Sequence, residues 1–236
     1  LPLLPSTILT IQGLVYTSVF NLSDRRKNVE DLLSAFLLAF QDREDVTLVL
    51  KLATNPSREF HEVRLFQDIY SKQGIRHRCR IAVITDYLSD EEMVRLSQAT
   101  TYYLNASRAE GACLPLQEAL AAGRPALAPA HTAMSDYMDD QVGFVLETHP
   151  EPTFWPHDPE RSYETYWNRI VWSHLRDQLL ESARVAEYDR ERYYAMGRAA
   201  QARLKHMASC DAACRALEEA IEGLRDFNEQ CVKWAA

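Results

Sequence analysis

Six short apolar segments, each separated from the next by a stretch of helical character, constrain the fold of this chain most strongly. The first, LVYTSVF at 14–20, and the second, VTLVLKL at 46–52, are rich in β-branched residues and lack polar alternation. This pattern is typical of strands buried on both faces. The other expected strands are residues 80–85, 101–107, 125–130 and 143–147. We therefore predict a doubly wound, Rossmann-like α/β fold whose parallel sheet has about six strands.

Helical patterns occupy the intervals between these strands. Apolar residues recur at helical spacing from Val29 to Phe40, which predicts one amphipathic helix. Ser89, with Glu92 three residues later, has the spacing of a capping box at the start of another helix. The remaining expected helices are residues 58–73, 114–122 and 132–139.

The composition changes after Pro150. The segment PEPTFWPHDPE at 150–160 favours a proline-rich loop, and from Arg161 onward the pattern predicts only helices. We therefore expect a connector at 1–13, a Rossmann-like domain at 14–150 and a helical extension at 151–236 that packs on it. The chain starts at Leu1 rather than Met, so we also expect an excised piece of a longer protein.

Charge and cysteine usage exclude several classes of function. The net charge is −8 and no long basic run occurs, which argues against binding to a nucleic acid backbone. The chain has five cysteines, an odd number, and they show neither CxxC pairs nor the spacing of a Cys/His metal site. We therefore expect reduced thiols and a cytoplasmic location. We expect no metal and no cofactor. No apolar run approaches the roughly 18 residues of a membrane span.

Chemically useful side chains follow three of the expected strands. The loop after the first strand holds Arg25, Arg26 and Lys27, and the second strand ends at Lys51. The loop after the fourth strand leads through Ser107 to the segment EGACLPLQEALAAGRPALAP at 110–129. The carboxyl ends of parallel strands share one edge, where ligands bind. Cations beside a helix N-terminus at that edge would suit a small phosphorylated ligand.

Two carboxylates, Glu110 and Glu118, stand eight positions apart around the start of the helix expected at 114–122. Gly111 would let the backbone approach a ligand closely, and the N–H groups of residues 111–114 have no helical partners. Glu110 could accept hydrogen bonds from sugar hydroxyls, and Glu118, one turn inside the helix, could bridge the two hydroxyls of a ribose. The segment therefore suits a sugar, a diphosphate and a nucleoside laid in a row.

This segment resembles the signature of the retaining glycosyltransferases of family 4, which have the GT-B fold. The shared features are the Glu-x7-Glu spacing, the Gly after the first Glu, the central Leu-Pro and the Glu-Ala-x-x-Ala-Gly-x-Pro that follows. VFNLSDRRKNVEDLLSAF is similar to the first strand, basic loop and helix of that family, and DYLSDEEMVRLSQATTYYLNASRAEG to the stretch before its motif. The resemblance spans about residues 14–147. It implies the C-terminal, donor-binding half of an enzyme that transfers a hexose.

The resemblance also implies roles for individual residues. Lys27 and Arg26 would hold the diphosphate of a nucleotide-diphosphate sugar, Glu110 would contact the sugar hydroxyls, and Glu118 would hold the ribose. The further expected contacts are Arg25, Lys51, Ser107 and the backbone of Gly111, Ala112, Cys113 and Leu114. Glu110 and Lys27 are the catalytic candidates. A glycan or lipid-linked acceptor would bind an absent N-terminal half, and the full protein could associate peripherally with the inner face of the membrane.

The chain also departs from the family pattern. Phe20 and Asn21 stand where many members have Gly-Arg at the end of the first strand, and Gly111-Ala112-Cys113 stands where many have Gly-Phe-Gly. A non-catalytic sugar-nucleotide-binding or assembly module therefore stays open, as does a sugar-nucleotide epimerase of the same fold. Simpler interpretations are a surface pair between Glu110 and Arg108, and a Glu118 that only complements the helix dipole.

Overall fold

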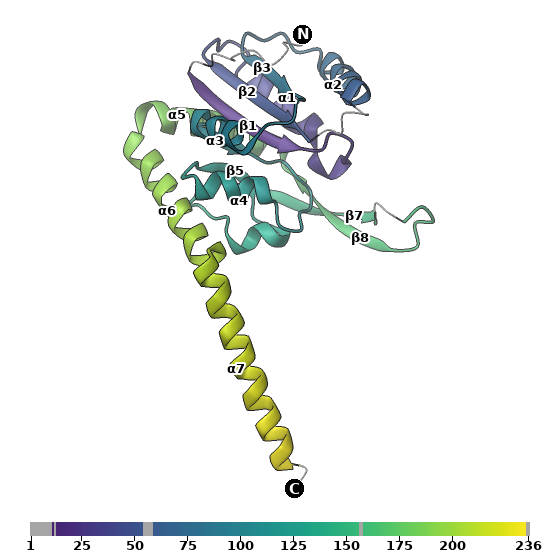
Figure 1. Cartoon of the computed structure of the whole chain (residues 1–236). Helices are drawn as coiled ribbons and strands as arrows, with labels where there is room; N and C mark the ends of the chain where they lie inside the picture. The colour runs from purple at the N-terminus through teal and green to yellow at the C-terminus, as the bar shows by residue number, and fades with distance from the viewer. Residues whose placement is uncertain (1–10, 12, 54–58, 156–157, 235–236) are drawn as a thin grey trace.

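The protein, seen here as a computed structural model, is described at residues 11, 13–53, 59–155 and 158–234, with side chains of the last helix up to residue 224. Six strands form one parallel sheet in the order β3-β2-β1-β4-β5-β6 (Figure 1). Their bounds are β1 Leu14–Phe20, β2 Val46–Leu52, β3 Arg80–Ile84, β4 Tyr102–Leu104, β5 Ala126–Pro129 and β6 Gly143–Leu146. The predicted doubly wound α/β fold is therefore confirmed. The strand order reverses at the boundary between the neighbouring strands β1 and β4, because the connection from β3 to β4 carries the chain to the other half of the sheet. Ligands bind at such a switch point.

The helices that connect these strands follow the sequence pattern closely. They are α1 Val29–Ala39, α2 Glu59–Gln73, α3 Asp90–Ala99 and α4 Leu114–Ala121, with short 3-10 helices η1 Arg25–Lys27 and η2 Thr132–Asp136. The capping box before α3 is confirmed, because the Ser89 hydroxyl accepts from the Glu92 N–H and the Glu92 carboxylate accepts from the Ser89 N–H. Residue 58, the expected start of the second helix, lies outside the described residues.

Aromatic packing holds the central strands against the helices on one face of the sheet. The fully buried ring of Tyr16 on β1 lies 5.6 Å from the rings of both Phe36 on α1 and Tyr102 on β4, centroid to centroid. The Tyr16 hydroxyl is 2.8 Å from Oγ of Ser182 on α5 (Trp172–Tyr188), so the one polar atom of this ring is satisfied. On the opposite face, Leu116 and other buried residues of α4 belong to a second apolar cluster.

An antiparallel hairpin follows β6, in place of the expected loop and helix. β7 (Thr148–Phe154) pairs with β8 (Glu164–Ile170) from Thr148↔Ile170 to Phe154↔Glu164, and the hairpin extends beyond the sheet (Figure 1). The predictions of a proline-rich loop at 150–160 and of helices only from Arg161 were therefore wrong. Prolines are tolerated in an exposed edge strand, and the β-branched and aromatic residues of 165–167 favour extended structure.

Three helices end the chain: α5, α6 (Arg190–Ala208) and α7 (Cys210–Trp234). α5 and α6 pack on the α/β unit, with Leu175 and Leu204 buried, whereas α7 points away from it (Figure 1). Leu217 on α7 is 62% exposed. Within the described part of the chain, no helix has both the length and the apolarity to cross a bilayer. The division of the chain at 13 and 150 stays a prediction.

The close approach of α4 and α6 depends on a glycine. A Cβ built on Gly197 of α6 would lie 2.6 Å from the carbonyl oxygen of Gly123, just after α4, whereas one on Gly223 of α7 would meet nothing within 4 Å. We expect Gly197→Ala to lower the free energy of unfolding by about 1–3 kcal/mol through overpacking. Gly223→Ala is the matched control, since alanine only improves helix propensity there. Urea unfolding of both variants measures the difference, and equal stabilities would contradict the packing argument.

Candidate functional site

The loop between β1 and α1 is built as a rigid basic turn at the carboxyl edge of the sheet. The Asp24 carboxylate accepts from the Arg26 N–H at 3.0 Å and caps η1, and Asn28 takes a left-handed conformation with φ 53° between η1 and α1. Asp and Asn are the residues that such caps and left-handed positions favour. The three cations of Arg25–Lys27 are therefore presented by defined local structure.

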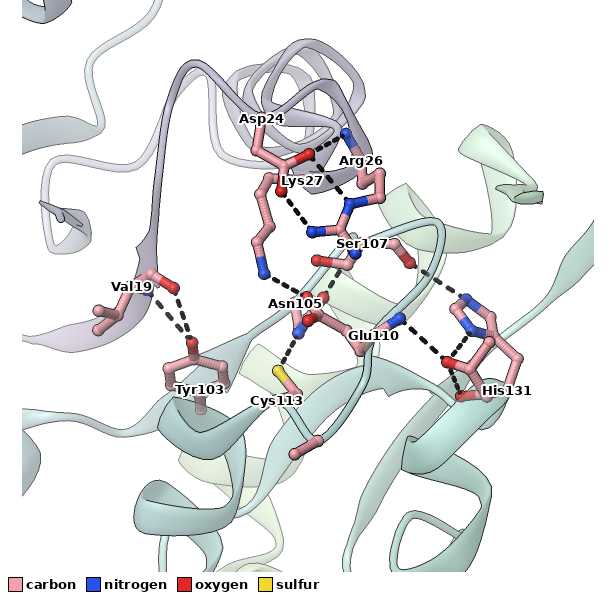
Figure 2. A network of polar contacts seen from close by, with 12 residues as sticks. Val19, Asp24, Arg26, Lys27, Tyr103, Asn105, Ser107, Glu110, Cys113 and His131 are labelled. Atoms are coloured by element: carbon pink, nitrogen blue, oxygen red, sulfur yellow. Dashed lines mark hydrogen bonds and ion pairs between the residues drawn. The ribbon is translucent and has the colours of Figure 1, made fainter. Parts of the chain in front are cut away.

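The two catalytic candidates are in direct contact. Nζ of Lys27 donates to Oε1 of Glu110 at 2.5 Å (Figure 2), and the two side chains are 19% and 7% exposed. Topology explains the meeting, because the loops that follow the neighbouring strands β1 and β4 reach the same edge. The simpler interpretation that paired Glu110 with Arg108 was wrong, since the ion-pair partner of Glu110 is Lys27.

Backbone contacts fix the position of Glu110. Its N–H donates to Oγ1 of Thr132 at 3.1 Å, and Nε2 of His131 donates to the carbonyl oxygen of Ser107 at 3.1 Å. The Ser107 N–H in turn donates to Oδ1 of Asn105 at 2.6 Å (Figure 2). Burial lowers the pKa of His131, which favours the neutral ring. The loop after β4 is therefore held from both sides before any ligand is present.

Helix α4 starts beside this loop, and Pro115 in its first turn carries no backbone N–H. Cys113 precedes the helix in a left-handed conformation with φ 54°, and no side chain caps the helix start. Burial, with a further contribution from the charge of Glu110, raises the pKa of the Cys113 thiol to about 12. The thiol is therefore protonated and packs as a small apolar group, which supports the interpretation that it is not a nucleophile. Gly111 is exposed and nothing lies within 4 Å of its Cβ position, so a ligand has room there.

The other basic candidates make contacts of their own beside the Lys27–Glu110 pair. The Arg26 guanidinium donates to Asp24 at 2.6 and 3.2 Å, and Arg25 is exposed. Nζ of Lys51 is buried and donates to the Leu52 carbonyl at 2.7 Å, and burial lowers its pKa. Lys51 thus contacts its own strand instead of reaching toward the loops. The roles expected for these residues stay predictions.

Glu118 lies on the exposed face of α4, away from Glu110. It lines a cleft of about 770 Å³ between α4 and α6, together with Arg198 and Lys205 of α6. The exposed Leu114 lines the same cleft at the start of α4. The structure therefore gathers Lys27, Ser107, Glu110 and Cys113 at one position and places Glu118 in a separate cleft between α4 and α6.

Arg108 connects the loops around the candidate site, a role that the sequence did not predict. Its N–H donates to the Arg26 carbonyl at 2.7 Å, its guanidinium donates to Oδ1 of Asn28 at 3.2 Å, and its carbonyl accepts from the Asn168 N–H at 2.9 Å. Its guanidinium also lies 5.6 Å from the ring of Trp167, at cation–π distance. Arg108 thus joins η1, the loop after β4 and the hairpin. The only available sequence signal was the β-rich run around Trp167, which was taken as helix.

The chain offers no metal site among the residues that the structure describes, where no group of three or more His, Cys, Asp or Glu side chains converges. The chemistry at the Lys27–Glu110 pair consists of a cation and a carboxylate beside the start of α4. Such a set can bind an anion and orient hydroxyl groups.

We expect the Lys27–Glu110 pair to contribute to stability through mutual neutralisation. Lys27→Met leaves the Glu110 carboxylate, with 7% of its side chain exposed, without its cation, and should lower the free energy of unfolding by about 1–3 kcal/mol. Lys27→Met/Glu110→Gln removes both charges and should recover most of that loss. Urea unfolding of the two single variants and the double variant measures the coupling. A double variant that loses the sum of the two single effects would show that the charges do not interact.

Comparison with known proteins identifies the family. The sequence profile of the family described as "Glycosyl transferases group 1" matches residues 12–154, more than half of the chain. The chain therefore belongs to the group 1 glycosyl transferases. None of the curated protein sequences matches it.

Solved structures share the fold at low sequence identity. The C-terminal domain of the glycosyl transferase group 1 protein LpcC from Francisella tularensis matches with a TM-score of 0.55 and 18% identity, over 84% of this chain and 87% of that domain. Sucrose-phosphate synthase from Thermosynechococcus elongatus matches with a TM-score of 0.63 and 17% identity, over 92% of this chain and 47% of its own. Anabaena HepE, solved in complex with UDP and glucose, matches with a TM-score of 0.60 and 14% identity, over 89% and 48%.

These matches agree with the C-terminal domain of a GT-B glycosyltransferase as the fold of this chain. The chain spans about half the length of sucrose-phosphate synthase and of HepE.

Proposed function

We propose that this chain is the donor-binding half of a retaining glycosyltransferase of family 4, which transfers a hexose from a nucleotide-diphosphate sugar to a glycan or lipid-linked acceptor. The observation that carries the proposal is the contact between Lys27 and Glu110 at the carboxyl edge of the sheet, beside the uncapped start of α4. Membership of the group 1 glycosyl transferases supports it, as does the bound UDP and glucose of the structurally similar HepE.

The proposed chemistry uses each group for one task. Lys27 and the backbone N–H groups of residues 111–114 would stabilise the diphosphate as it leaves, because charge develops there in the transition state. Glu110 would accept hydrogen bonds from the hydroxyls of the donor sugar and orient the ring. The acceptor would attack the face from which the diphosphate departs, and the diphosphate would help to take the acceptor proton.

The rest of the proposal concerns the protein beyond this chain. The acceptor would bind an N-terminal half that this chain does not contain, so the isolated chain would bind donor without transferring sugar. Cytoplasmic location and peripheral association with the membrane belong to the same proposal. A proton-accepting side chain for the acceptor is not assigned to this chain.

A non-catalytic sugar-nucleotide-binding or assembly module is the second candidate function. Two observations favour it. Asn21 stands where many family members carry a phosphate-binding arginine, and the Arg26 guanidinium forms an ion pair with Asp24. Both reduce the positive charge available to a diphosphate.

The test has two stages. Thermal shifts with UDP, GDP, ADP and the corresponding nucleosides show whether the chain binds a diphosphate, since any ligand of the folded state raises the melting temperature. A transfer assay on the chain joined to its N-terminal half then separates the two candidates. Absence of any shift by a diphosphate would refute the donor site, and binding without transfer by the joined protein would favour the non-catalytic module.

A further inference from the structure

A cleft of about 740 Å³ separates the basic loop after β1 from the hairpin β7–β8. Asn21, Asp24 and Arg25 line it on the loop side, and Phe154 and Trp167 on the hairpin side. None of the roles discussed so far explains why the chain places aromatic side chains opposite η1. The cleft is distinct from the one that contains Glu118.

The hairpin wall of this cleft is held in place by contacts to Arg108 in the loop after β4. The Asn168 N–H donates to the Arg108 carbonyl at 2.9 Å, and the Trp167 ring lies beneath the Arg108 guanidinium. Because Arg108 also bonds to the Arg26 carbonyl, the two walls of the cleft are connected through a single residue. The cleft is therefore built by the same network that positions the loop of Glu110.

The lining combines flat apolar rings with groups of both charges. Phe154 is 39% exposed and Trp155, which also lines the cleft, is 54% exposed, while the Arg161 guanidinium lies 5.8 Å from the Phe154 ring. An aromatic face can stack on the C–H face of a pyranose ring. Carboxylates such as Asp24 accept from sugar hydroxyls, and guanidinium groups donate to them. Rings, carboxylates and the guanidinium groups of Arg25, Arg26 and Arg161 together fit a sugar better than an apolar ligand.

We propose that this cleft binds a pyranose unit of the acceptor, so that the hairpin and the loop after β1 contribute an acceptor subsite to the donor half. Arg25 and Arg26 of η1 line the cleft, and the next residue of η1, Lys27, contacts Glu110, so the loop after β1 connects the cleft to the Lys27–Glu110 pair. The inference deepens the proposed function and rests on it, because a bound sugar is an acceptor only if the protein is a glycosyltransferase. The binding of a sugar in the cleft does not depend on that function.

The experiment measures binding of the methyl glycosides of glucose, galactose, mannose and glucuronic acid by saturation-transfer NMR titration. Phe154→Ala/Trp155→Ala removes two rings of the cleft and is expected to weaken glycoside binding by about tenfold or more. Tyr163→Ala/Tyr166→Ala is the matched control, because both tyrosines are exposed on the same hairpin and neither lines the cleft. Trp155→Phe keeps a stacking face and should retain binding. Circular dichroism confirms that each variant is folded.

The outcomes separate this inference from the proposed function. Retained UDP binding in Phe154→Ala/Trp155→Ala, with glycoside binding lost, supports the acceptor subsite. Loss of nucleoside binding instead would assign the cleft to the nucleobase, and loss of glycoside binding in Glu110→Gln alone would assign the glycoside to the donor position. Absence of signal from all four glycosides, or unchanged binding by the cleft variant, would also overturn the inference. Glycoside binding without any nucleoside diphosphate binding would refute only the proposed function.

Discussion

Replacing Lys27 with alanine is expected to weaken binding of a nucleoside diphosphate by about 10- to 150-fold, with little effect on the nucleoside alone. A hydrogen bond to a charged group is typically worth about 1.5–3 kcal/mol, which corresponds to that range of affinity. Lys27 is well placed for such a contact, because its ammonium group is only partly exposed and stands at the carboxyl edge of the sheet. Calorimetric titration with UDP and uridine, or with the pair that gives the largest thermal shift, measures the difference.

The control must account for the ion pair that Lys27 forms with Glu110. Lys27→Ala leaves the Glu110 carboxylate unneutralised, and this charge would itself repel a diphosphate. Lys27→Ala/Glu110→Gln removes that repulsion, so any loss that remains belongs to the missing contact. Lys72→Ala, an exposed lysine in the last turn of α2, controls for net charge. Equal losses for diphosphate and nucleoside would place the phosphates elsewhere.

The sheet was predictable from sequence because strands buried on both faces are apolar throughout. β2 is buried at all seven positions, and its pattern, VTLVLKL, shows no alternation that could suggest another class. Short crossover connections explain why β1, β2 and β3 are neighbours and why β4, β5 and β6 are neighbours, but not why β4 pairs with β1. The parallel sheet alone predicts that Lys27 and Glu110 share its carboxyl edge, whereas their contact depends on the pairing of β1 with β4.

The hairpin could not be predicted by the same argument. Its prolines, Pro150 and Pro152, are read as loop signals in an isolated sequence, yet both pair within β7. A two-stranded ribbon is marginal by itself and depends on tertiary contacts. Those contacts come through Arg108, whose partners are far away in sequence. The hairpin wall of the cleft beside η1 and the role of Arg108 could therefore not be predicted from the sequence.

The position of Glu118 shows a second limit. The spacing predicts that Glu118 lies one turn inside α4, and the structure agrees. The spacing does not predict which other element packs beside the face of α4 that carries Glu118. The carboxylate faces a cleft shared with α6, a helix that lies more than 70 residues later in the chain. The proposed ribose contact therefore depends on a wall that local sequence does not reveal.

The two glutamates are expected to fail differently when each is replaced by glutamine. Glu110→Gln should leave affinity for a bare nucleoside diphosphate within a few-fold of wild type, because that ligand lacks the donor sugar that the carboxylate would orient. In the complete enzyme the same change should lower kcat by about 100-fold, the scale expected when a reacting group is misplaced by about 1 Å. Glu118→Gln should weaken every ribose-containing ligand by about 5- to 30-fold, since the amide keeps one acceptor but loses the charge.

The structure supplies a reason for this division of labour and a way to refute it. Glu110 is buried against Lys27, whereas Glu118 is exposed in the cleft with Arg198 and Lys205. Calorimetry of both variants with UDP and UDP-glucose, or the matching pair for the nucleotide that binds, gives four affinities. Arg198→Ala tests whether Glu118 serves only as a partner for α6. In that case Arg198→Ala and Glu118→Gln would both lower stability, and neither would weaken ligand binding. Equal losses of both ligands in both glutamate variants would contradict separate roles, because two carboxylates that hold different parts of one ligand cannot be interchangeable.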